Sequence, residues 1–242
     1  MQIGIAGITG RMGRMLAEAV PAAGGDLVGG VGHAGDLAAL AKRCDAIIDF
    51  THESTVARHA EILAETRTPW VLGTTGLTQE DEALIDGAAA AIPVFVAANF
   101  SRGINLIAAL AERLAAALPA TSHDVEIVEM HHRQKVDAPS GTARTLGRAV
   151  AAGRGGNFED LVEQGRAGHT GARKPGSIGI ASLRGGQIVG SHSVLFTGSA
   201  EQVVVTHHAF DRRIFANGAV RAAFWLEGKP PGRYGMREML GI

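Results

Sequence analysis

Three glycines at three-residue spacing follow a short apolar segment at the start of the chain. Gln2–Ala6 has the composition of a buried strand, Gly7, Gly10 and Gly13 come next, and apolar residues then recur at helical spacing. A strand, a glycine turn and a helix in this order are the context of a dinucleotide-binding turn, in which amides at the helix N-terminus meet the pyrophosphate. The spacing differs by one residue from G-x-G-x-x-G, so a glycine-rich turn without a ligand is the alternative interpretation.

The first hundred residues continue as alternating strands and helices. Strands are predicted at Asp26–Val31, Ala46–Phe50, Trp70–Leu72 and Val94–Val96, and Thr78–Asp81 is typical of a capping box. This alternation predicts an α/β fold with a Rossmann-like, doubly wound parallel sheet. Ligands of such sheets bind beyond the carboxyl ends of the strands, where the sequence places two more segments that are otherwise plain turns. They are Gly73, Thr74 and Thr75, and Ala97, Ala98, Asn99 and Phe100.

The pattern changes after Ser101, where a second domain of α+β type is predicted to begin. Its expected strands are His123–Met130, Ser177–Leu183, Gln187–Phe196 and Glu201–His208. The second and third of these are predicted to form a hairpin through Gly185-Gly186. We expect a sheet without helices to cover both of its faces, which would leave an apolar face open. The apolar side chains expected there are Val189, Val194, Phe196, Val203 and Val205.

The stretch between residues 126 and 143 carries the most unusual chemistry. Two histidines, an arginine and a lysine lie within residues 131–135, and Ser140 then suits the N-cap of a helix. The unpaired amides at such a helix start, behind several cationic side chains, predict a site for an anion such as a carboxylate. Neighbouring positive charges favour proton release from Lys135, which makes it a candidate general acid.

Two other interpretations of this stretch stay open on the residues alone. His131 and His132 with Glu129 and Asp137 could bind a metal ion, although nothing in the sequence shows that they converge. A solvated basic turn is the second alternative. His169, in a basic loop, and the strand residues His192, His207 and His208 are expected to have structural or interface roles.

Composition narrows the class of protein. The chain has 242 residues, is 46% hydrophobic and 19% charged, and carries a net charge of −1. Such a balance gives no reason to expect nucleic-acid binding, and no apolar run is long enough for a membrane span. One cysteine, Cys44, excludes an internal disulfide, and the chain enters a strand without a basic leader. We therefore expect a cytoplasmic globular protein with no nucleic-acid or membrane partner.

The stretch also resembles a known family signature. It reads Glu129-Met130-His131-His132-Arg133-Gln134-Lys135-Val136-Asp137-Ala138-Pro139-Ser140-Gly141-Thr142-Ala143, which closely resembles the signature of the dihydrodipicolinate reductases. The resemblance extends along nearly the whole chain and includes the Gly-x-x-Gly-Arg-Met-Gly form of the first turn. It implies an NAD(P)H-dependent reduction of 4-hydroxy-tetrahydrodipicolinate, or of dihydrodipicolinate, to tetrahydrodipicolinate in the diaminopimelate route to lysine.

The resemblance assigns roles to particular residues. It implies His131 and Lys135 as catalytic residues, no metal site, and a substrate pocket formed by His132, Ser140, Gly141 and Thr142. It implies a cofactor site for NADPH or NADH, formed by Gly7, Ile8, Thr9, Gly10, Arg11, Met12, Gly13, His33, Gly73, Thr74, Thr75, Ala97, Ala98, Asn99 and Phe100. A homotetramer is also implied, with a discontinuous dinucleotide-binding domain of residues 1–101 and 211–242. Residues 102–210 would then form the substrate-binding and tetramerisation domain.

The chain departs from the family at the residues that contact the adenosine ribose of the cofactor. Relatives often carry an acidic residue and then a basic one after the second strand, where this chain has Gly32-His33. We expect both nicotinamide cofactors to work, with a modest preference for NADPH that rests on His33. Two rival functions stay open: another nicotinamide-dependent dehydrogenase of amino-acid metabolism, or a non-catalytic nucleotide-sensing protein.

Overall fold

The computed structural model describes all residues from Met1 to Ile242. They form two compact units, which are described separately. Unit 1 comprises Met1–Arg102 and Arg213–Ile242, and unit 2 comprises Gly103–Arg212. No helix is long and apolar enough to cross a membrane.

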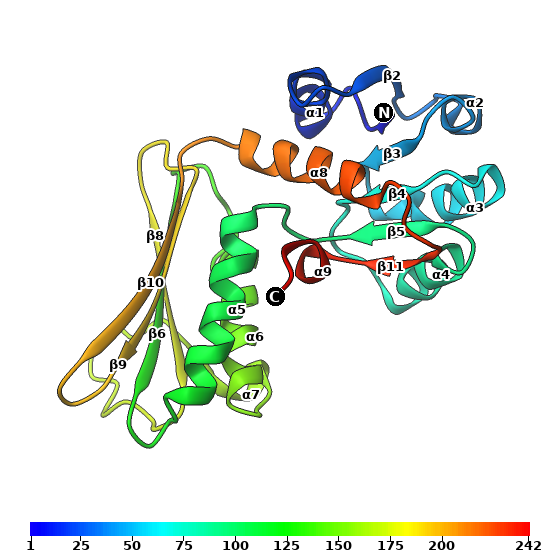
Figure 1. Cartoon of the computed structure of the whole chain (residues 1–242). Coiled ribbons are helices and arrows are strands. Elements are labelled where there is room, and N and C mark those ends of the chain that lie inside the picture. The colour runs from blue at the N-terminus through cyan, green and yellow to red at the C-terminus, as the bar shows by residue number, and fades with distance from the viewer. The chain divides into compact units, whose positions relative to one another are not determined.

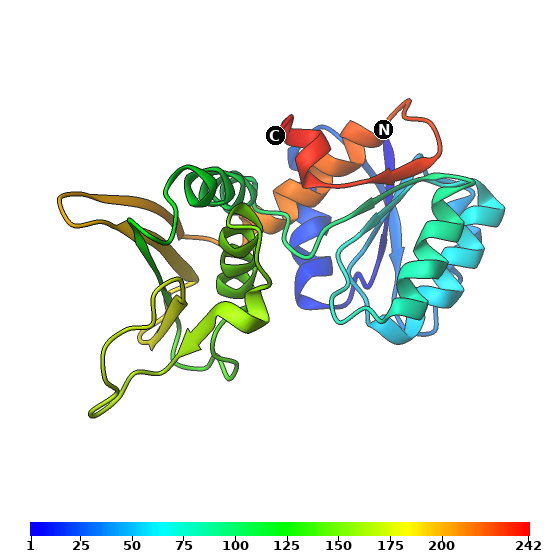
Figure 2. The ribbon, with the colours of Figure 1, turned by 90° about the horizontal axis from the view of Figure 1, so that it is seen from below.

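Unit 1 is built on a parallel six-stranded sheet with helices on both faces (Figures 1 and 2). The strand order is β11-β5-β4-β3-β1-β2, in agreement with the predicted doubly wound α/β class. The strands are β1 (Gln2–Ala6), β2 (Asp26–Val31), β3 (Ala46–Asp49), β4 (Trp70–Leu72), β5 (Pro93–Val96) and β11 (Gly232–Tyr234). The helices are α1 (Arg11–Ala22), α2 (Leu37–Ala41), η1 (Glu53–Thr55), α3 (Val56–Thr66), α4 (Gln79–Ala89), α8 (Arg213–Leu226) and α9 (Met236–Leu240).

Alternate residues of the strands separate two hydrophobic cores. Ile48 of β3 packs with α1, α8 and α9 on one face, whereas Ile47 packs with α2, α3 and α4 on the other. The central strands β1, β3, β4 and β5 are buried on both faces along nearly their whole length, which explains why they read as continuous apolar runs. The predicted capping box is present, since the Thr78 hydroxyl accepts from the amide of Asp81 at 3.2 Å.

Strand β11 was not predicted from the sequence. It spans three residues, Gly232–Tyr234, and pairs with β5 in parallel at the edge of the sheet. A strand this short, which begins at a glycine after two prolines, has no alternation by which it could be recognised. Its position follows from α8, which packs against α1, β3, β4 and β5 and so brings the end of the chain back to this sheet.

Unit 2 holds a five-stranded mixed sheet in the order β10-β9-β6-β8-β7. The strands are β6 (Asp124–His131), β7 (Val162–Gln164), β8 (Ile178–Arg184), β9 (Gly190–Thr197) and β10 (Gln202–Ala209). The helices are α5 (Arg102–Ala117), α6 (Gly141–Gly153) and α7 (Phe158–Leu161). They lie on one face of the sheet, and the other face is uncovered in this chain (Figure 1).

The predicted hairpin between the second and third strands of this domain is wrong. Strand β6 lies between β8 and β9, parallel to β8 and antiparallel to β9. The connection from β8 therefore passes over the end of β6, where the Gly185 amide donates to the His131 carbonyl at 2.9 Å. Gly185 and Gly186 therefore lie in a connection that crosses the end of β6, and they do not form a two-residue hairpin turn. As a result, β8 and β9 lie on either side of the strand that carries His131.

The prediction also named the wrong side chains for the open apolar face of this sheet. Val194 and Phe196 are completely buried beneath the helices, and Val203 and Val205 pack against the same core. Helix α6 contacts β6, β8 and β9, so it covers the face that was expected to be open. Strand alternation then places the neighbouring residues of β9 and β10, including the exposed Val204, on the opposite face.

Candidate active site

A cavity of about 580 Å³ lies at the carboxyl ends of β1, β2 and β3 in unit 1. Gly7, Thr9 and Gly10 of the glycine turn line it, together with Gly32 and His33 from the end of β2. The turn is tied to the sheet, because the Gly7 amide donates to the Val31 carbonyl at 2.8 Å. Most of the remaining lining comes from residues 50–59 after β3 and includes Arg58, which has no ion-pair or hydrogen-bond partner in the chain.

This turn requires glycines because its backbone segments approach one another closely. Gly7 has a φ of 85°, a conformation that favours glycine. A Cβ atom on Gly13 would lie 2.1 Å from the Gly7 carbonyl oxygen, and 2.5 Å from Cα of Ile8. The first turn of α1 therefore packs directly on the loop and leaves no room for a side chain at position 13. The arrangement fits a dinucleotide pyrophosphate at the N-terminus of a helix.

The other expected cofactor residues lie beyond the ends of β4 and β5. Gly73 faces the Phe50 ring so closely that a Cβ atom would lie 2.4 Å from it. The Asn99 side chain accepts from the Ser101 amide at 2.8 Å, which shapes the bend after β5. Phe100 is 1% exposed and its ring packs against Phe50 and Phe95. Its side chain belongs to the core, so only its backbone is available to a ligand.

In unit 2, β6 ends in a completely buried carboxylate, Glu129. Arg184 of β8 donates to both of its oxygens, at 2.9 Å and 2.8 Å. The His131 Nδ1 atom lies 2.6 Å from Oε2, and the Ser140 amide donates to Oε1 at 3.2 Å. Burial alone would raise the pKa of Glu129, but hydrogen bonds from Arg184, Ser182, His131 and Ser140 outweigh it and lower the pKa to about 2. Glu129 is therefore an anion at neutral pH.

His131 is 9% exposed and lies between charged and aromatic neighbours. Burial lowers its pKa below the usual value, against the opposing effect of Glu129. His192 of β9 packs edge-on against it with ring centroids 5.0 Å apart, and the Nε2 atom of His192 lies 3.2 Å from the Ser140 hydroxyl. Burial, and next the charge of His131, lower the pKa of His192 to about 4.

Arg184 and His192 belong to this cluster, and sequence reasoning assigned neither to it. They lie on β8 and β9, more than fifty residues after His131, and they meet it only because β6 inserts between those strands. His192 was expected to have a structural or interface role. The predicted hairpin would have paired β8 with β9 and hidden this arrangement.

The predicted helix start is present and carries the expected cap. The Ser140 hydroxyl accepts from the Ala143 amide at 3.2 Å, so α6 begins at Gly141. A Cβ atom on Gly141 would meet nothing within 4 Å, so the space beside the first amides is open. The first turn of α6 therefore has the properties of an anion site, as expected for Gly141 and Thr142.

Lys135 and His132 of the same stretch also have partners within the chain. The Lys135 ammonium donates to Oδ1 of Asp137 at 2.8 Å, and this bond lowers the pKa of Asp137. His132 lies 3.0 Å from the Arg212 guanidinium, which is always a donor, so Nε2 of His132 accepts. Arg212 is thus a further cation beside His132 that the sequence motif did not include.

The hydrogen bonds of the Glu129 carboxylate disfavour a metal ion at this cluster. Glu129, His131 and His192 have ligand atoms within 4.8 Å of one another, whereas His132 and Asp137 are not part of this set. The Arg184 guanidinium already donates to both carboxylate oxygens, so a cation would be placed directly beside it. An internal ion pair explains the cluster without a metal.

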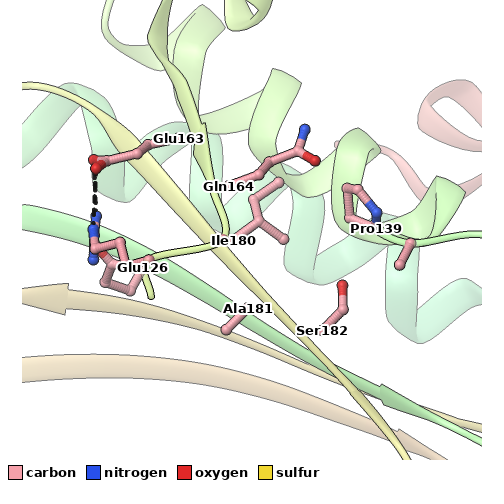
Figure 3. Close-up of a pocket in the computed structure, with 10 residues that line it drawn as sticks. Glu126, Pro139, Glu163, Gln164, Ile180, Ala181 and Ser182 are labelled. Atoms are coloured by element: carbon pink, nitrogen blue, oxygen red, sulfur yellow. Dashed lines mark hydrogen bonds and ion pairs between the residues drawn. The ribbon is translucent and has the colours of Figure 1, made fainter. Parts of the chain in front are cut away.

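A second cavity, of about 470 Å³, lies on the other side of the 137–140 turn (Figure 3). Ile180, Ala181 and Ser182 of β8 run along it, with Pro139 on one side and Glu163 on the other. Its charged groups are paired within the chain, since Glu163 accepts twice from Arg166, at 3.1 Å and 2.9 Å.

Comparison with known proteins identifies the family. Residues 1–100 match the family "Dihydrodipicolinate reductase, N-terminus", and residues 103–240 match "Dihydrodipicolinate reductase, C-terminus". The chain belongs to the dihydrodipicolinate reductase family. The 4-hydroxy-tetrahydrodipicolinate reductase of Acidiphilium cryptum is 65% identical over 100% of this chain and 98% of its own length. That of Gluconacetobacter diazotrophicus is 55% identical over 100% of this chain and 98% of its own length.

Solved structures show the same fold. A dipicolinate-bound dihydrodipicolinate reductase from Paenisporosarcina sp. TG-14 superimposes with a TM-score of 0.76 at 23% identity, and the match covers 99% of each chain. A diaminopimelate (DAP) dehydrogenase of C. glutamicum gives a TM-score of 0.54 at 15% identity, over 98% of this chain and 93% of that one. The fold is therefore shared with reductases of this family and with other dehydrogenases.

Proposed function

We propose that this reductase converts 4-hydroxy-tetrahydrodipicolinate, or the dihydrodipicolinate formed by its dehydration, to tetrahydrodipicolinate in the diaminopimelate route to lysine. The whole-length match to the family and the 65% identity to a named reductase support this activity. The observation that carries it within the molecule is the start of α6. A capped helix N-terminus there follows His131, His132 and Lys135, which suits a ring that bears carboxylates.

Each residue of this stretch has a role in the proposal. The amides of Gly141 and Thr142 bind a substrate carboxylate at the helix start, with Ser140 as the cap that orients them. His132 contacts the substrate in this proposal, and the Arg212 guanidinium that donates to it adds positive charge beside the pocket. Lys135 donates the proton that the reduced ring requires, and His131 is a further donor or acceptor.

Unit 1 is proposed to be the dinucleotide-binding domain, and unit 2 the substrate-binding domain. A bound reduced nicotinamide supplies the hydride for the reaction. The glycine turn from Gly7 to Gly13 holds the pyrophosphate in this proposal, because it lines the cavity at the N-terminus of α1. The segments after β4 and β5 extend the cofactor site along the same edge of the sheet.

We further propose that both NADPH and NADH are accepted. Gly32 and His33 follow β2 directly, so neither residue supplies a carboxylate that would repel a 2′-phosphate or bind the ribose diol. His33 lines the cavity and offers a hydrogen bond, and Arg58 adds a permanent positive charge to the same lining. Together they support a modest preference for NADPH.

A homotetramer is proposed for the assembly, through the sheet of unit 2. The face opposite the helices presents Val128, Met130, Leu195 and Val204, of which Val204 is 45% exposed. A second copy of the chain would cover these apolar side chains. Light scattering at micromolar concentration should give a particle several times the 25.1 kDa chain mass, and a 25.1 kDa particle would contradict the assembly.

The activity is tested by following NADPH absorbance with substrate freshly made by dihydrodipicolinate synthase. The proposed reductase consumes NADPH only when that product is present. Another nicotinamide-dependent dehydrogenase would require a different substrate, such as aspartate or homoserine. A nucleotide-sensing protein would bind NADPH without consuming it, and either result would refute the proposal.

A further inference from the structure

The Glu129–Arg184 ion pair lies deep in the candidate active site. Glu129 is 0% exposed, and Arg184 binds it with two parallel hydrogen bonds of 2.9 Å and 2.8 Å. The same Nη2 atom of Arg184 also donates to the Asp137 carbonyl oxygen at 2.6 Å. The pair therefore joins the ends of β6 and β8 to the turn that precedes α6.

Both functional parts of the site touch this pair. His131 bonds to Glu129 through Nδ1 at 2.6 Å, and the Ser140 amide at the cap of α6 donates to the other carboxylate oxygen. One ion pair therefore contacts both parts of the proposed site. The first is the His131 imidazole, which is proposed to donate or accept a proton, and the second is the Ser140 cap of α6, where a carboxylate is proposed to bind.

An ionised carboxylate can only accept hydrogen bonds, which determines the protonation of His131. Its Nδ1 atom must carry the hydrogen, so in the neutral ring Nε2 keeps its lone pair. Nε2 lies beside Gly190, where a Cβ atom would be 3.1 Å away, so no side chain from that position covers it. The other charged or titratable groups that act on the ring are His192 of β9, Arg184 of β8 and Lys135 of the following loop.

We propose that Glu129 and Arg184 are positioning residues for the reduction: the pair holds His131 in the Nδ1–H tautomer and fixes the start of α6 relative to that imidazole. This inference rests on the roles proposed above for His131, Gly141 and Thr142. A purely structural pair would need neither the histidine nor the cap as partners, and an apolar pair could replace it with little loss of stability. Here every oxygen of Glu129 is used to orient a group of the site.

The tautomer can be measured directly by nitrogen NMR of the holoenzyme labelled with ¹⁵N-histidine. We expect the wild-type His131 signals to show the proton on Nδ1. In Glu129→Gln the new amide can donate to Nδ1, so the proton should move toward Nε2. Glu163→Gln is the matched control, because Glu163 also accepts a bidentate arginine in this sheet but lies outside the site. His131 should be unchanged in that control.

Kinetics and binding separate positioning from stability. Glu129→Gln should lower kcat by roughly 100-fold with a smaller change in KM, as expected when a group that orients a catalytic histidine is lost. Arg184→Lys cannot reach both Glu129 and the Asp137 carbonyl, so it should weaken binding of dipicolinate, used as a probe, by about tenfold. Glu163→Gln should leave both quantities within about twofold of wild type.

The inference is overturned if wild-type His131 carries its proton on Nε2, or if Glu129→Gln keeps both the wild-type tautomer and kcat. The wild-type spectrum decides the first point even where a variant fails to fold. A wild-type enzyme that shows the Nδ1–H tautomer but no reductase activity would instead refute the proposed function, so the two failures are distinguishable.

Discussion

The cavity of unit 1 and the charged cluster of unit 2 are built from different parts of the polypeptide. In unit 1 the proposed ligand contacts are backbone groups, and glycines such as Gly7 and Gly13 matter because they lack side chains. In unit 2 the proposed proton donors and acceptors are side chains, and both oxygens of Glu129 orient neighbouring groups. A backbone site depends on local conformation, whereas a side-chain cluster depends on which strands become neighbours.

The largest expected effect is on the side-chain cluster. Lys135→Ala and His131→Ala should each lower kcat by roughly two to four orders of magnitude, because each removes a positioned acid or base. The dissociation constant for NADPH should be nearly unchanged, since both residues belong to unit 2. Wild-type turnover in Lys135→Ala would remove this lysine from the mechanism.

The buried histidines should also make unit 2 sensitive to acid. Burial lowers the pKa of the His192 imidazole from its ordinary value of 6.5 to about 4. The unfolded chain therefore binds a proton on this side chain more readily than the folded protein does. The free energy of unfolding should therefore be highest above pH 6.5 and decrease by up to about 3 kcal/mol as the pH falls to about 4. Urea titrations at several pH values measure this loss.

His192→Gln is the control for acid sensitivity. It removes the titrating group, so the dependence on pH should become shallower, although His131 and His207, whose pKa values are also lowered, keep part of it. An unchanged slope in this variant would mean that His192 does not contribute.

A single methyl group should damage the backbone site of unit 1. In Gly13→Ala the new Cβ would lie 2.1 Å from the Gly7 oxygen, so the helix or the loop must move. Overpacking of this kind costs about 1–3 kcal/mol, which predicts an increase of about tenfold or more in the NADPH dissociation constant. Gly87→Ala on α4 is the matched control, because its Cβ meets nothing within 4 Å. Equal affinity in both variants would contradict the packing argument.

Substrate binding by unit 2 should respond more weakly. His132→Ala should mainly raise KM for the dicarboxylate, by about tenfold, because it loses one polar contact to a charged group. Thr142→Ala keeps the backbone amide and removes only the hydroxyl, so it should raise KM less. Steady-state kinetics at saturating NADPH provide the measurement. A KM that stays at the wild-type value in both variants would place the carboxylate elsewhere.

The smallest effect should be on cofactor preference. His33→Ala should reduce the ratio of NADPH to NADH affinity by about twofold to threefold, because it removes a hydrogen bond to the 2′-phosphate. Arg58→Ala should also reduce the ratio, since it removes a permanent positive charge from the same cavity lining. A ratio that neither variant changes would contradict both roles, and His33 would then only stack on the adenine.

The difference between the units also explains what could be predicted from the sequence. The glycine turn, the strand ends and the Ser140 cap are local features, so their neighbours in sequence determine them. The parallel sheet followed from alternating elements, but the three residues of β11 carried no periodic signal. The contacts of His131 with Arg184 and His192 depend on the insertion of β6 between β8 and β9, which no local pattern records.

The central claim is that a hydride passes from the nicotinamide to a dicarboxylate ring on this enzyme. It is tested most directly with NADPH that carries deuterium at the transferred C4 position, synthase product as substrate, and mass spectrometry of the tetrahydrodipicolinate formed. We predict that the product gains a single deuterium in the wild type and that Lys135→Ala forms the same labelled product far more slowly. Product without deuterium, or NADPH consumption that does not depend on the substrate, would contradict the account.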